Sequence, residues 1–318
     1  MKCFKKLKNI SQPSAVALGN FDGVHNGHQA LLKHLLAEAK RRRLEPVVVV
    51  FEPQPSEYFS AHKSANKAIQ LSPRLYTLRQ KYHYIQELGE FSFYCISFNE
   101  KIASLEPEVF ARQFIFESLQ AKYVLVGNDF RFGVHRSGDV ALLQRMALEQ
   151  HAEVHTFAEC NIDKKRVSST AIRECLQRGD LDYATKLLGR PFGFIGRVGR
   201  GRGLAREWAV PTANIVLLRK VLPIQGVFLV RVRHCKTQEW FWGVANIGCR
   251  PTLTVSKPLL EVHLFDVERQ LYGEFLEVFL CEKIRDEQRF GSIDQLVQQI
   301  HKDISVAHAK ISDSLLSL

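Results

Sequence analysis

The sequence lacks the features that mark several special classes of protein. Its 318 residues contain no apolar run long enough to cross a membrane, and the N-terminus has no uninterrupted apolar segment of the signal-peptide kind. The seven cysteines are odd in number and form no CxxC pair, which argues against a disulfide framework and a zinc site. Internal repeats and low-complexity tracts are also absent. We therefore expect a cytoplasmic protein with reduced thiols and no membrane association.

Charge is unbalanced towards positive, with a formal net charge of +11. Such an excess attracts polyanions, among them nucleic acids, nucleotides and pyrophosphate. The basic run 40–43 ends an expected helix, where cations complement the helix dipole. The net charge alone therefore does not identify a binding partner. An RNA- or DNA-binding protein would also need interleaved basic and aromatic surface residues. We find no such motif and expect no nucleic-acid partner.

The chain is long enough for two domains, and its 46 % apolar and 24 % charged residues fit an ordinary folded protein. In the first half, apolar runs alternate with helical patterns, which predicts an α/β domain with a parallel sheet and helices on both faces. The expected strands are 46–51, 91–98 and 122–127, and the expected helices are 74–88, 107–119 and 138–150.

In the second half, short apolar runs follow one another at close spacing with turn residues between them. This pattern predicts a compact antiparallel β-barrel. The expected strands are 192–198, 227–233, 240–247, 259–265 and 275–280. One amphipathic C-terminal helix follows, with apolar side chains from Ile293 to Ile304 on one side.

Residues 19–28 read Gly-Asn-Phe-Asp-Gly-Val-His-Asn-Gly-His and are the strongest functional signal in the chain. A buried-strand pattern precedes them and a helical pattern follows, so free backbone N–H groups and the helix dipole favour an anion at this turn. Gly23 and Gly27 let the backbone approach a phosphate. His25 and His28 place two donors where an α-phosphate gains charge during nucleotidyl transfer. A plain turn with two surface histidines is the alternative.

Three further segments of the first half carry candidate binding residues. The loop 51–55, Phe-Glu-Pro-Gln-Pro, suits either a ligand wall or a rigid connector. The loop 127–133 offers aromatic rings and Asn128 to a flat ring, a base or a ribose, and packing on the core is the alternative. Residues 168–173, Ser-Ser-Thr-Ala-Ile-Arg, place an arginine one turn inside a hydroxyl-rich helix start, which suits β- and γ-phosphates; helix capping is the alternative.

Together these segments resemble the prokaryotic bifunctional riboflavin kinase/FMN adenylyltransferases, also called FAD synthetases. The resemblance runs in order along nearly the whole chain. Its motifs in the second half are PTANI at 211–215, GVANIG at 243–248, LEVHLFD at 260–266 and Ile-Arg at 284–285. The histidine turn alone fits several nucleotidyltransferases, including ones that act on pantetheine phosphate or nicotinamide mononucleotide. The second half has no purpose in those alternatives.

The resemblance implies a Rossmann-like nucleotidyltransferase domain over residues 1–185 and a riboflavin kinase β-barrel domain over residues 186–318. ATP would phosphorylate riboflavin to FMN, and a second ATP would adenylate FMN to FAD with release of pyrophosphate. The implied ligands are riboflavin, FMN, FAD, ATP and Mg²⁺, and we expect a monomer or weak oligomer.

The family pattern also assigns site residues. The implied catalytic residues are His25, His28, Arg173 and Glu261. The residues implied for ATP and its phosphates are Gly19, Phe21, Asp22, Gly23, Gly27, Ser168, Ser169, Thr170, Gly199 and Gly201. Those implied for the flavin are Asn128, Phe130 and Arg285.

Phosphoryl transfer to riboflavin needs a cation on the phosphates and a base for the hydroxyl proton. Thr212 and Asn214 are two residues apart at a strand start, so their side chains share a face and can both reach one Mg²⁺. The family pattern assigns them that metal. On its strand position alone, Glu261 fits an outward, solvated carboxylate better than a catalytic base. Only the resemblance, in which Glu261 matches the position of the base, reverses that preference.

One segment departs from the family pattern. Residues 205–209 read Ala-Arg-Glu-Trp-Ala where Gly-Arg-x-Leu-Gly is usual, so two alanines remove access to positive φ where the ATP loop folds. We expect a functional kinase with an altered nucleotide loop. An FMN adenylyltransferase whose barrel only binds flavin is the alternative.

Overall fold

The computed structural model describes residues 3–4, 10, 12–62, 72–200, 211–217, 221–250 and 257–316. The chain divides into two compact units. The first unit is Met1–Ser72 with Leu78–Ser169, and the second is Pro73–Thr77 with Thr170–Leu318.

A six-stranded parallel sheet forms the centre of the first unit, in the order β1-β4-β3-β2-β5-β6. The strands are β1 (Cys3–Phe4), β2 (Ser14–Leu18), β3 (Glu45–Glu52), β4 (Ser92–Ser97), β5 (Ala121–Gly127) and β6 (Glu153–Phe157). The predicted parallel sheet is confirmed. The sequence did not predict β6, because this edge strand buries only Val154 among mostly exposed polar neighbours.

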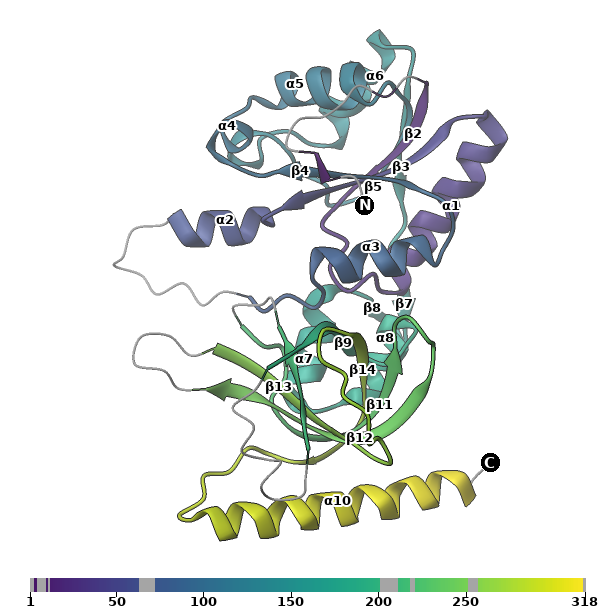
Figure 1. Ribbon diagram of the computed structural model, residues 1–318. Helices are drawn as coiled ribbons and strands as arrows, with labels where there is room; N and C mark the ends of the chain where they lie inside the picture. The colour runs from purple at the N-terminus through teal and green to yellow at the C-terminus, as the bar shows by residue number, and fades with distance from the viewer. Residues whose placement is uncertain are drawn as a thin grey trace. The chain divides into compact units, whose positions relative to one another are not determined.

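Helices cover both faces of this sheet, as predicted (Figure 1). The helices of this unit are α1 (Asn26–Arg42), α2 (Pro55–His62), α3 (Leu78–Gln86), α4 (Glu100–Ala103), α5 (Pro107–Phe110), a π-helix (Ala111–Ser118) and α6 (Val140–Glu149). Val47 and Val49 face the core that α5, the π-helix and α6 share, so Val48 and Val50 face the opposite side. Because both sides are covered, these strands are apolar without alternation. A short hairpin, β7 (Asn161–Ile162) with β8 (Lys165–Arg166), completes the unit.

Two helix predictions need correction. The helix expected over 74–88 begins only at Leu78. The preceding residues 73–77 belong to the second unit, where Tyr76 is fully buried and its ring stacks on that of Phe192 with centroids 5.9 Å apart. The helix expected over 107–119 is α-helical for one turn and then continues as the wider π-helix.

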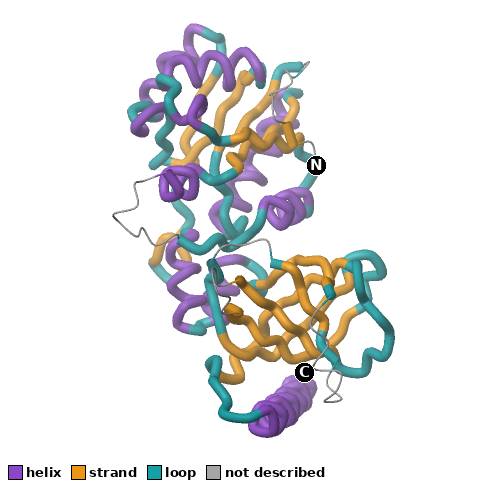
Figure 2. The backbone as a smooth tube through the Cα atoms, turned by 60° about the vertical axis from the view of Figure 1, so that its left-hand side comes forward, coloured by secondary structure: helices purple, strands orange, loops and turns teal. Residues whose placement is uncertain are grey.

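The second unit holds the predicted antiparallel barrel, which is closed in the order β10-β13-β12-β11-β14-β9 (Figure 2). Its strands are β9 (Gly193–Gly199), β10 (Ala213–Val216), β11 (Gly226–His234), β12 (Trp240–Arg250), β13 (Lys257–Leu264) and β14 (Phe275–Arg285). Alternate residues such as Phe228, Ala245 and Val262 are fully buried and point inward. Two helices, α7 (Ser169–Arg178) and α8 (Leu181–Leu188), precede the barrel.

Helix α10 (Ile293–Leu316) lies along the outside of the barrel, as Figure 2 shows. Its buried Ala307 packs in one cluster with Val227 and Leu229, which point outward from β11. The Arg285 guanidinium at the end of β14 donates to both carboxylate oxygens of Asp303, with Nη2 2.8 Å from Oδ2. Asp303 is only 4 % exposed, so this ion pair joins α10 to the barrel with little solvent screening.

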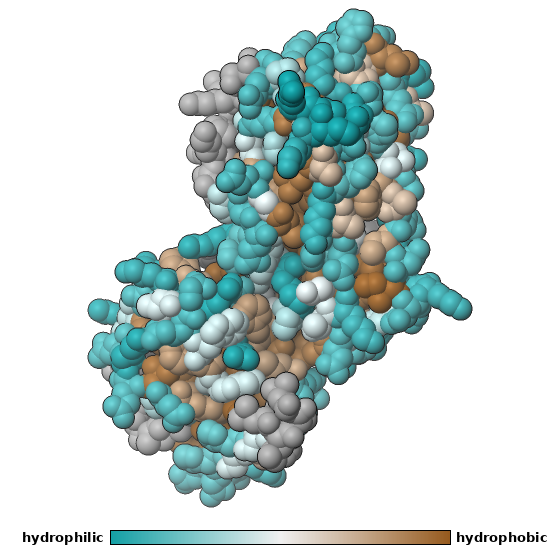
Figure 3. Space-filling model, turned by 90° about the vertical axis from the view of Figure 1, so that its right-hand side faces the viewer, coloured by the Kyte–Doolittle hydropathy of each residue, from teal (hydrophilic) through white to brown (hydrophobic). Residues whose placement is uncertain are grey.

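The surface in view is largely polar, with apolar side chains in several separate groups (Figure 3). Among the described residues, no helix is both long enough and apolar enough to span a bilayer.

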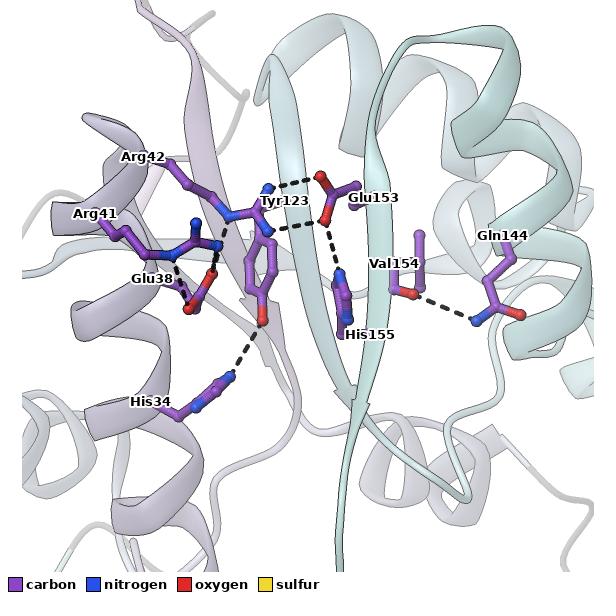
Figure 4. A network of polar contacts seen from close by, with 9 residues as sticks. All are labelled: His34, Glu38, Arg41, Arg42, Tyr123, Gln144, Glu153, Val154 and His155. Atoms are coloured by element: carbon purple, nitrogen blue, oxygen red, sulfur yellow. Dashed lines mark hydrogen bonds and ion pairs between the residues drawn. The ribbon is translucent and has the colours of Figure 1, made fainter.

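A network of polar side chains links α1 to β5 and β6 (Figure 4). Arg42 binds both carboxylate oxygens of Glu153 at 2.8 Å, and its guanidinium lies 4.6 Å from the ring centroid of Tyr123. Arg42 also donates to Glu38 at 2.9 Å. The pKa of Glu153 falls from 4.5 to about 2 because Arg42, and then His155, hydrogen-bond its carboxylate. The pKa of Glu38 falls to about 2, through hydrogen bonds from Arg41 and then Arg42.

We predict that acid weakens this corner of the first unit. Since the folded-state pKa values of Glu38 and Glu153 lie below 4.5, their stabilisation is complete above that pH and is lost as the pH falls towards 2. Arg42→Met should lower the unfolding free energy at pH 7 by roughly 1 kcal/mol, since solvent screens the half-exposed Glu153. The same substitution should also make the unfolding free energy depend less on pH between pH 4.5 and 2. Hydrogen exchange of β5 and β6 amides measures both, and an unaltered acid dependence would contradict the prediction.

Candidate active site

The strand order brings three predicted binding loops to one edge of the sheet. β2 pairs with β3 on one side and with β5 on the other. The histidine turn follows β2, the loop 53–55 follows β3, and the loop 128–133 follows β5. From β2 the chain adds β3 and β4 on one side of the sheet, and then β5 and β6 on the other. Ligands of open α/β sheets bind at such a topological switch point. The histidine turn therefore lies where this fold places a ligand.

Within the turn, the two histidines stack on each other at the start of α1. Their ring centroids are 3.6 Å apart with an interplanar angle of 17°. Nδ1 of His25 accepts the backbone N–H of His28 at 3.4 Å, so His25 also caps the helix. The rings of Phe21 and His28 also contact each other in an edge-to-face arrangement, with centroids 5.2 Å apart and an interplanar angle of 65°. The two imidazoles thus lie together at the positive end of a helix dipole, a position that favours an anion.

The turn has a strained and closely packed backbone. Phe21 and Val24 are buried with φ of 45° and 42°, in a region that bulky residues rarely adopt. A Cβ on Gly19 would come within 3.2 Å of the Phe21 ring, and a Cβ on Gly27 within 3.3 Å of His25 Nδ1. Such strain is typical of functional sites. Each of the two glycines leaves the room that an aromatic or imidazole ring occupies.

The segment 168–173 contacts this turn through the side chain of Ser169. The Ser169 hydroxyl donates to the backbone carbonyl of Asp22 at 2.8 Å. Thr170 is exposed. Arg173 is half-buried, and its Nε donates to the carbonyl of Pro73 at 2.7 Å within the second unit. The roles predicted for Ser168, Thr170 and Arg173 therefore stay predictions.

The loop after β5 is fixed by an ion pair and by core packing. Arg166 donates to Asp129 at 2.9 Å, which ties the β7–β8 hairpin to the loop. Asn128 is exposed, whereas Phe130 is half-buried, packs on the core and stacks with Phe132 at 5.5 Å. Asn128 thus faces solvent at the site edge, and part of the Phe130 ring serves the core.

In the barrel, hydrogen-bond register aligns the predicted kinase residues. Asn214 of β10 lies directly opposite Glu261 of β13 on one side and Gly199 of β9 on the other. The same row continues through Asn246 of β12 and Val227 of β11 to Arg285 of β14. Directly opposed residues point to the same face. Since neighbours such as Ile215 and Val262 point inward, the side chains of Asn214 and Glu261 lie on the outer face.

The donor set beside Glu261 suits Mg²⁺. Thr212 and Asn214 offer a hydroxyl and an amide oxygen on the same face at the start of β10, and Mg²⁺ prefers oxygen ligands and keeps several waters. In the described parts of the chain, no cluster of three or more His, Cys, Asp or Glu side chains is placed to hold a metal ion. Phosphate oxygens of ATP would supply the further ligands that such a sparse protein set needs.

Two other barrel residues with predicted roles, Arg285 and Gly199, have surroundings that point less directly to a ligand. The guanidinium of Arg285, predicted to bind flavin, is held by Asp303 and also donates to the Asp286 carbonyl at 2.9 Å. Gly199 lies in the strand row, and a Cβ there would come within 2.9 Å of Val216. Gly201 and the altered segment 205–209 lie outside the described residues.

Sequence reasoning did not single out two polar residues near these candidate sites, Gln54 and Asn246. Gln54 is 5 % exposed, and its Nε2 has no hydrogen-bond partner in the described chain. It lies between two prolines at the end of β3, and a polar residue in so rigid a loop was the available signal. Asn246 is the second, and only the strand register shows that it lies beside Glu261.

Two family models match this chain, one for each half of the sequence. A model described as FAD synthetase matches residues 7–171, and one described as riboflavin kinase matches residues 188–311.

Curated relatives match the chain nearly from end to end. The bifunctional riboflavin kinase/FMN adenylyltransferase of Escherichia coli K12 is 41 % identical over 95 % of this chain and 96 % of its own length. That of Haemophilus influenzae is 42 % identical, covering 97 % and 99 %. A solved structure titled macrolide-efflux protein, from Streptococcus pneumoniae, is 29 % identical with a TM-score of 0.77, covering 96 % of this chain and 98 % of that one.

A parallel-sheet nucleotidyltransferase followed by a flavokinase barrel defines the class of flavin-nucleotide synthesising enzymes. The chain belongs to the bifunctional riboflavin kinase/FMN adenylyltransferase family. It therefore phosphorylates riboflavin to FMN and adenylates FMN to FAD, with ATP as co-substrate of both reactions.

We predict that Gly27→Ala slows FMN adenylation about tenfold, because its Cβ displaces the His25 ring. Cys160 Cβ, at 3.4 Å, closes the other side of the same space. The riboflavin kinase rate of the same protein should not change. Gly291→Ala is a matched control, since its Cβ meets only the end of the flexible Gln295 side chain at 3.4 Å. If Gly27→Ala formed FAD at the wild-type rate, the position of the His25 ring would not matter for FMN adenylation and the prediction would be wrong.

Proposed function

We propose that the first unit carries FMN adenylation at the histidine turn. An oxygen of the FMN phosphate attacks the α-phosphorus of ATP, the bond to the β-phosphate oxygen breaks, and pyrophosphate leaves. No protein nucleophile is needed, so catalysis consists of positioning and charge stabilisation. His25 and His28 stabilise the charge that develops on the α-phosphate. Their stacked geometry at the N-terminus of α1 is the observation that supports this role.

The barrel carries the kinase reaction on its outer face. The terminal ribityl hydroxyl of riboflavin attacks the γ-phosphorus of ATP, Glu261 takes the hydroxyl proton, and ADP leaves. A carboxylate in this position suits general-base catalysis, since it needs only to lie within hydrogen-bond reach of the substrate hydroxyl. The direct pairing of Glu261 with Asn214 supports the assignment, because it places the base next to the metal-binding amide.

Thr212 and Asn214 would hold Mg²⁺ against the ATP phosphates. The ion supplies neutralisation of the phosphate charge. The protein contributes an oxygen pair fixed by β10, and the opposed Glu261 stays on the same face.

The remaining assignments rest on the family pattern. Asn128, Phe130 and Arg285 are proposed for the flavin, and Ser168, Thr170 and Arg173 for the distal phosphates of ATP. We also propose that the enzyme acts in the cytoplasm as a monomer or weak oligomer, without nucleic-acid or membrane partners.

Two variants should separate the reactions within one chain. His25→Asn keeps a helix-capping side chain but removes the imidazole, so FMN adenylation should fall at least ~100-fold while riboflavin phosphorylation is unchanged. Glu261→Gln should do the reverse, with kinase activity lowered ~100-fold or more. Chromatography of flavins from reactions started with riboflavin or with FMN measures both. Loss of the same activity in both variants, or of neither, would contradict the proposed division.

The metal assignment makes a separate prediction. Asn214→Ala removes one of two protein oxygens, so half-maximal kinase rate should need about tenfold more Mg²⁺. The Mg²⁺ requirement of FMN adenylation in the same protein is the control and should not change. A kinase with an unaltered Mg²⁺ requirement would remove Asn214 from the metal site.

A further inference from the structure

A buried amide side chain lies just after β3, the strand beside the histidine turn. Gly19 of the turn donates its backbone N–H to the carbonyl of Val49 in β3 at 3.2 Å, so the turn leaves the sheet next to this strand. Gln54 is 5 % exposed, whereas residues 51–53 and 55–62 all keep more exposed surface. The Nε2 atom of Gln54 is buried and has no hydrogen-bond partner in the described chain. Such a donor destabilises a ligand-free protein and therefore calls for an acceptor.

The backbone of Gln54, in contrast, is fully hydrogen-bonded. Its carbonyl accepts the N–H groups of Glu57 at 2.9 Å and Tyr58 at 3.0 Å, and its own N–H donates to Oε2 of Glu57 at 3.2 Å. These bonds fix the residue at the start of α2, which continues from the end of β3 (Figure 1). The missing acceptor therefore concerns the side-chain amide alone, at the sheet edge where the fold places a ligand.

Aromatic side chains gather within a few residues of the same loop. Phe51 precedes the loop, and Tyr58 and Phe59 follow it in α2. All three rings contact that of Phe98, which follows β4, with centroids 5.3 to 5.8 Å away. Phe59 is 44 % exposed, so this ring cluster reaches the surface. The loop region thus offers a flat ligand an aromatic surface and one neutral hydrogen-bond donor.

The two substrates of FMN adenylation offer different acceptors to this donor. Phosphate groups are charged, and the N-terminus of α1 with its two histidines is the matching environment in this unit. Adenine presents ring nitrogens and an amino group, which is itself a donor, and it has no carbonyl oxygen. The isoalloxazine ring of FMN carries two carbonyl oxygens on its pyrimidine end, and a carbonyl oxygen accepts from an amide N–H. FMN is therefore the substrate whose flat ring complements both the donor and the ring cluster.

We propose that Gln54 binds the flavin substrate of FMN adenylation, with its side-chain N–H donating to a pyrimidine carbonyl oxygen of the isoalloxazine ring. This inference rests on the proposed placement of FMN adenylation at the histidine turn. Bound FMN supplies the acceptor that the ligand-free protein lacks. A flavin analogue without that oxygen leaves the buried donor unpaired and is bound less tightly, so Gln54 contributes to substrate specificity.

Gln54→Met tests the inference, because methionine matches glutamine in length and has no N–H donor. The KM for FMN in FAD formation should rise about tenfold, with kcat and the KM for ATP nearly unchanged, since the contact is made equally before and during the reaction. The ligand-free variant should melt about 2–4 °C above the wild type, because the unpaired donor is gone. Gln113→Met, at an exposed position of the same unit, is the matched control and should change neither quantity.

Thio analogues of FMN test the contact itself, because a thiocarbonyl sulfur is a weaker acceptor than a carbonyl oxygen. Sulfur at C2 or at C4 of the isoalloxazine ring replaces one oxygen at a time. With the wild type, one of the two analogues should show a KM about tenfold above that of FMN. With Gln54→Met, the same analogue and FMN should have equal KM values, since the partner of that oxygen is gone.

The outcomes separate the ways in which the inference can fail. An unchanged KM for FMN in Gln54→Met would overturn the binding role, and so would a lowered melting temperature, which marks a purely structural glutamine. A raised KM for ATP in place of FMN would assign the donor to the nucleotide and overturn the role equally. Wild-type FAD formation by His25→Asn would overturn the proposed adenylation site, and this inference with it. If His25→Asn behaves as predicted and Gln54→Met keeps the wild-type KM for FMN, this inference alone is wrong.

Discussion

Hydrogen bonding between strands determines which candidate catalytic side chains meet in this enzyme. In the first unit, pairing of β2 with both β3 and β5 brings three loops to one sheet edge around the histidine turn. In the barrel, antiparallel register aligns Gly199, Asn214 and Glu261 on neighbouring strands. A slip of one residue would turn Glu261 into the barrel interior and bring Val262 to the surface. The proposed chemistry of both units thus depends on backbone pairing before it depends on any side-chain contact.

The histidine turn shows a second use of backbone geometry. His25 is both helix cap and candidate catalyst, so the ring is held by the helix that supplies the positive dipole. Phe21 and Val24 keep positive φ because they are buried. The strain energy of two such residues is small compared with the packing energy of the sheet core. Core packing can therefore hold the turn in this conformation. The site is therefore preorganised, as reactions that rely on charge stabilisation require.

Local sequence was informative wherever a function or a fold is encoded within a few residues. The strand-to-helix turn at residues 19–28, the alternation of strands with helices in the first half and the change to a barrel pattern in the second were predicted correctly. The roles of the histidine-turn residues stay predictions. Pairings between distant segments were not readable from one sequence. Asn246 lies opposite Glu261 only because of the register of β12 with β13. Residues 73–77 are not part of their expected helix, and Tyr76 among them packs on Phe192 instead. Buried Gln54 became visible as an unpaired donor only once its surroundings were known.

The central claim is that one chain transfers a γ-phosphoryl group to riboflavin and then an adenylyl group to the product. Its most direct test follows phosphorus from ATP into FAD made from riboflavin by the purified protein. With label at the γ-phosphate, cleavage of the FAD should release labelled FMN and unlabelled AMP. With label at the α-phosphate, it should release unlabelled FMN and labelled AMP. FAD without γ-label, or no FAD from riboflavin at all, would contradict the account.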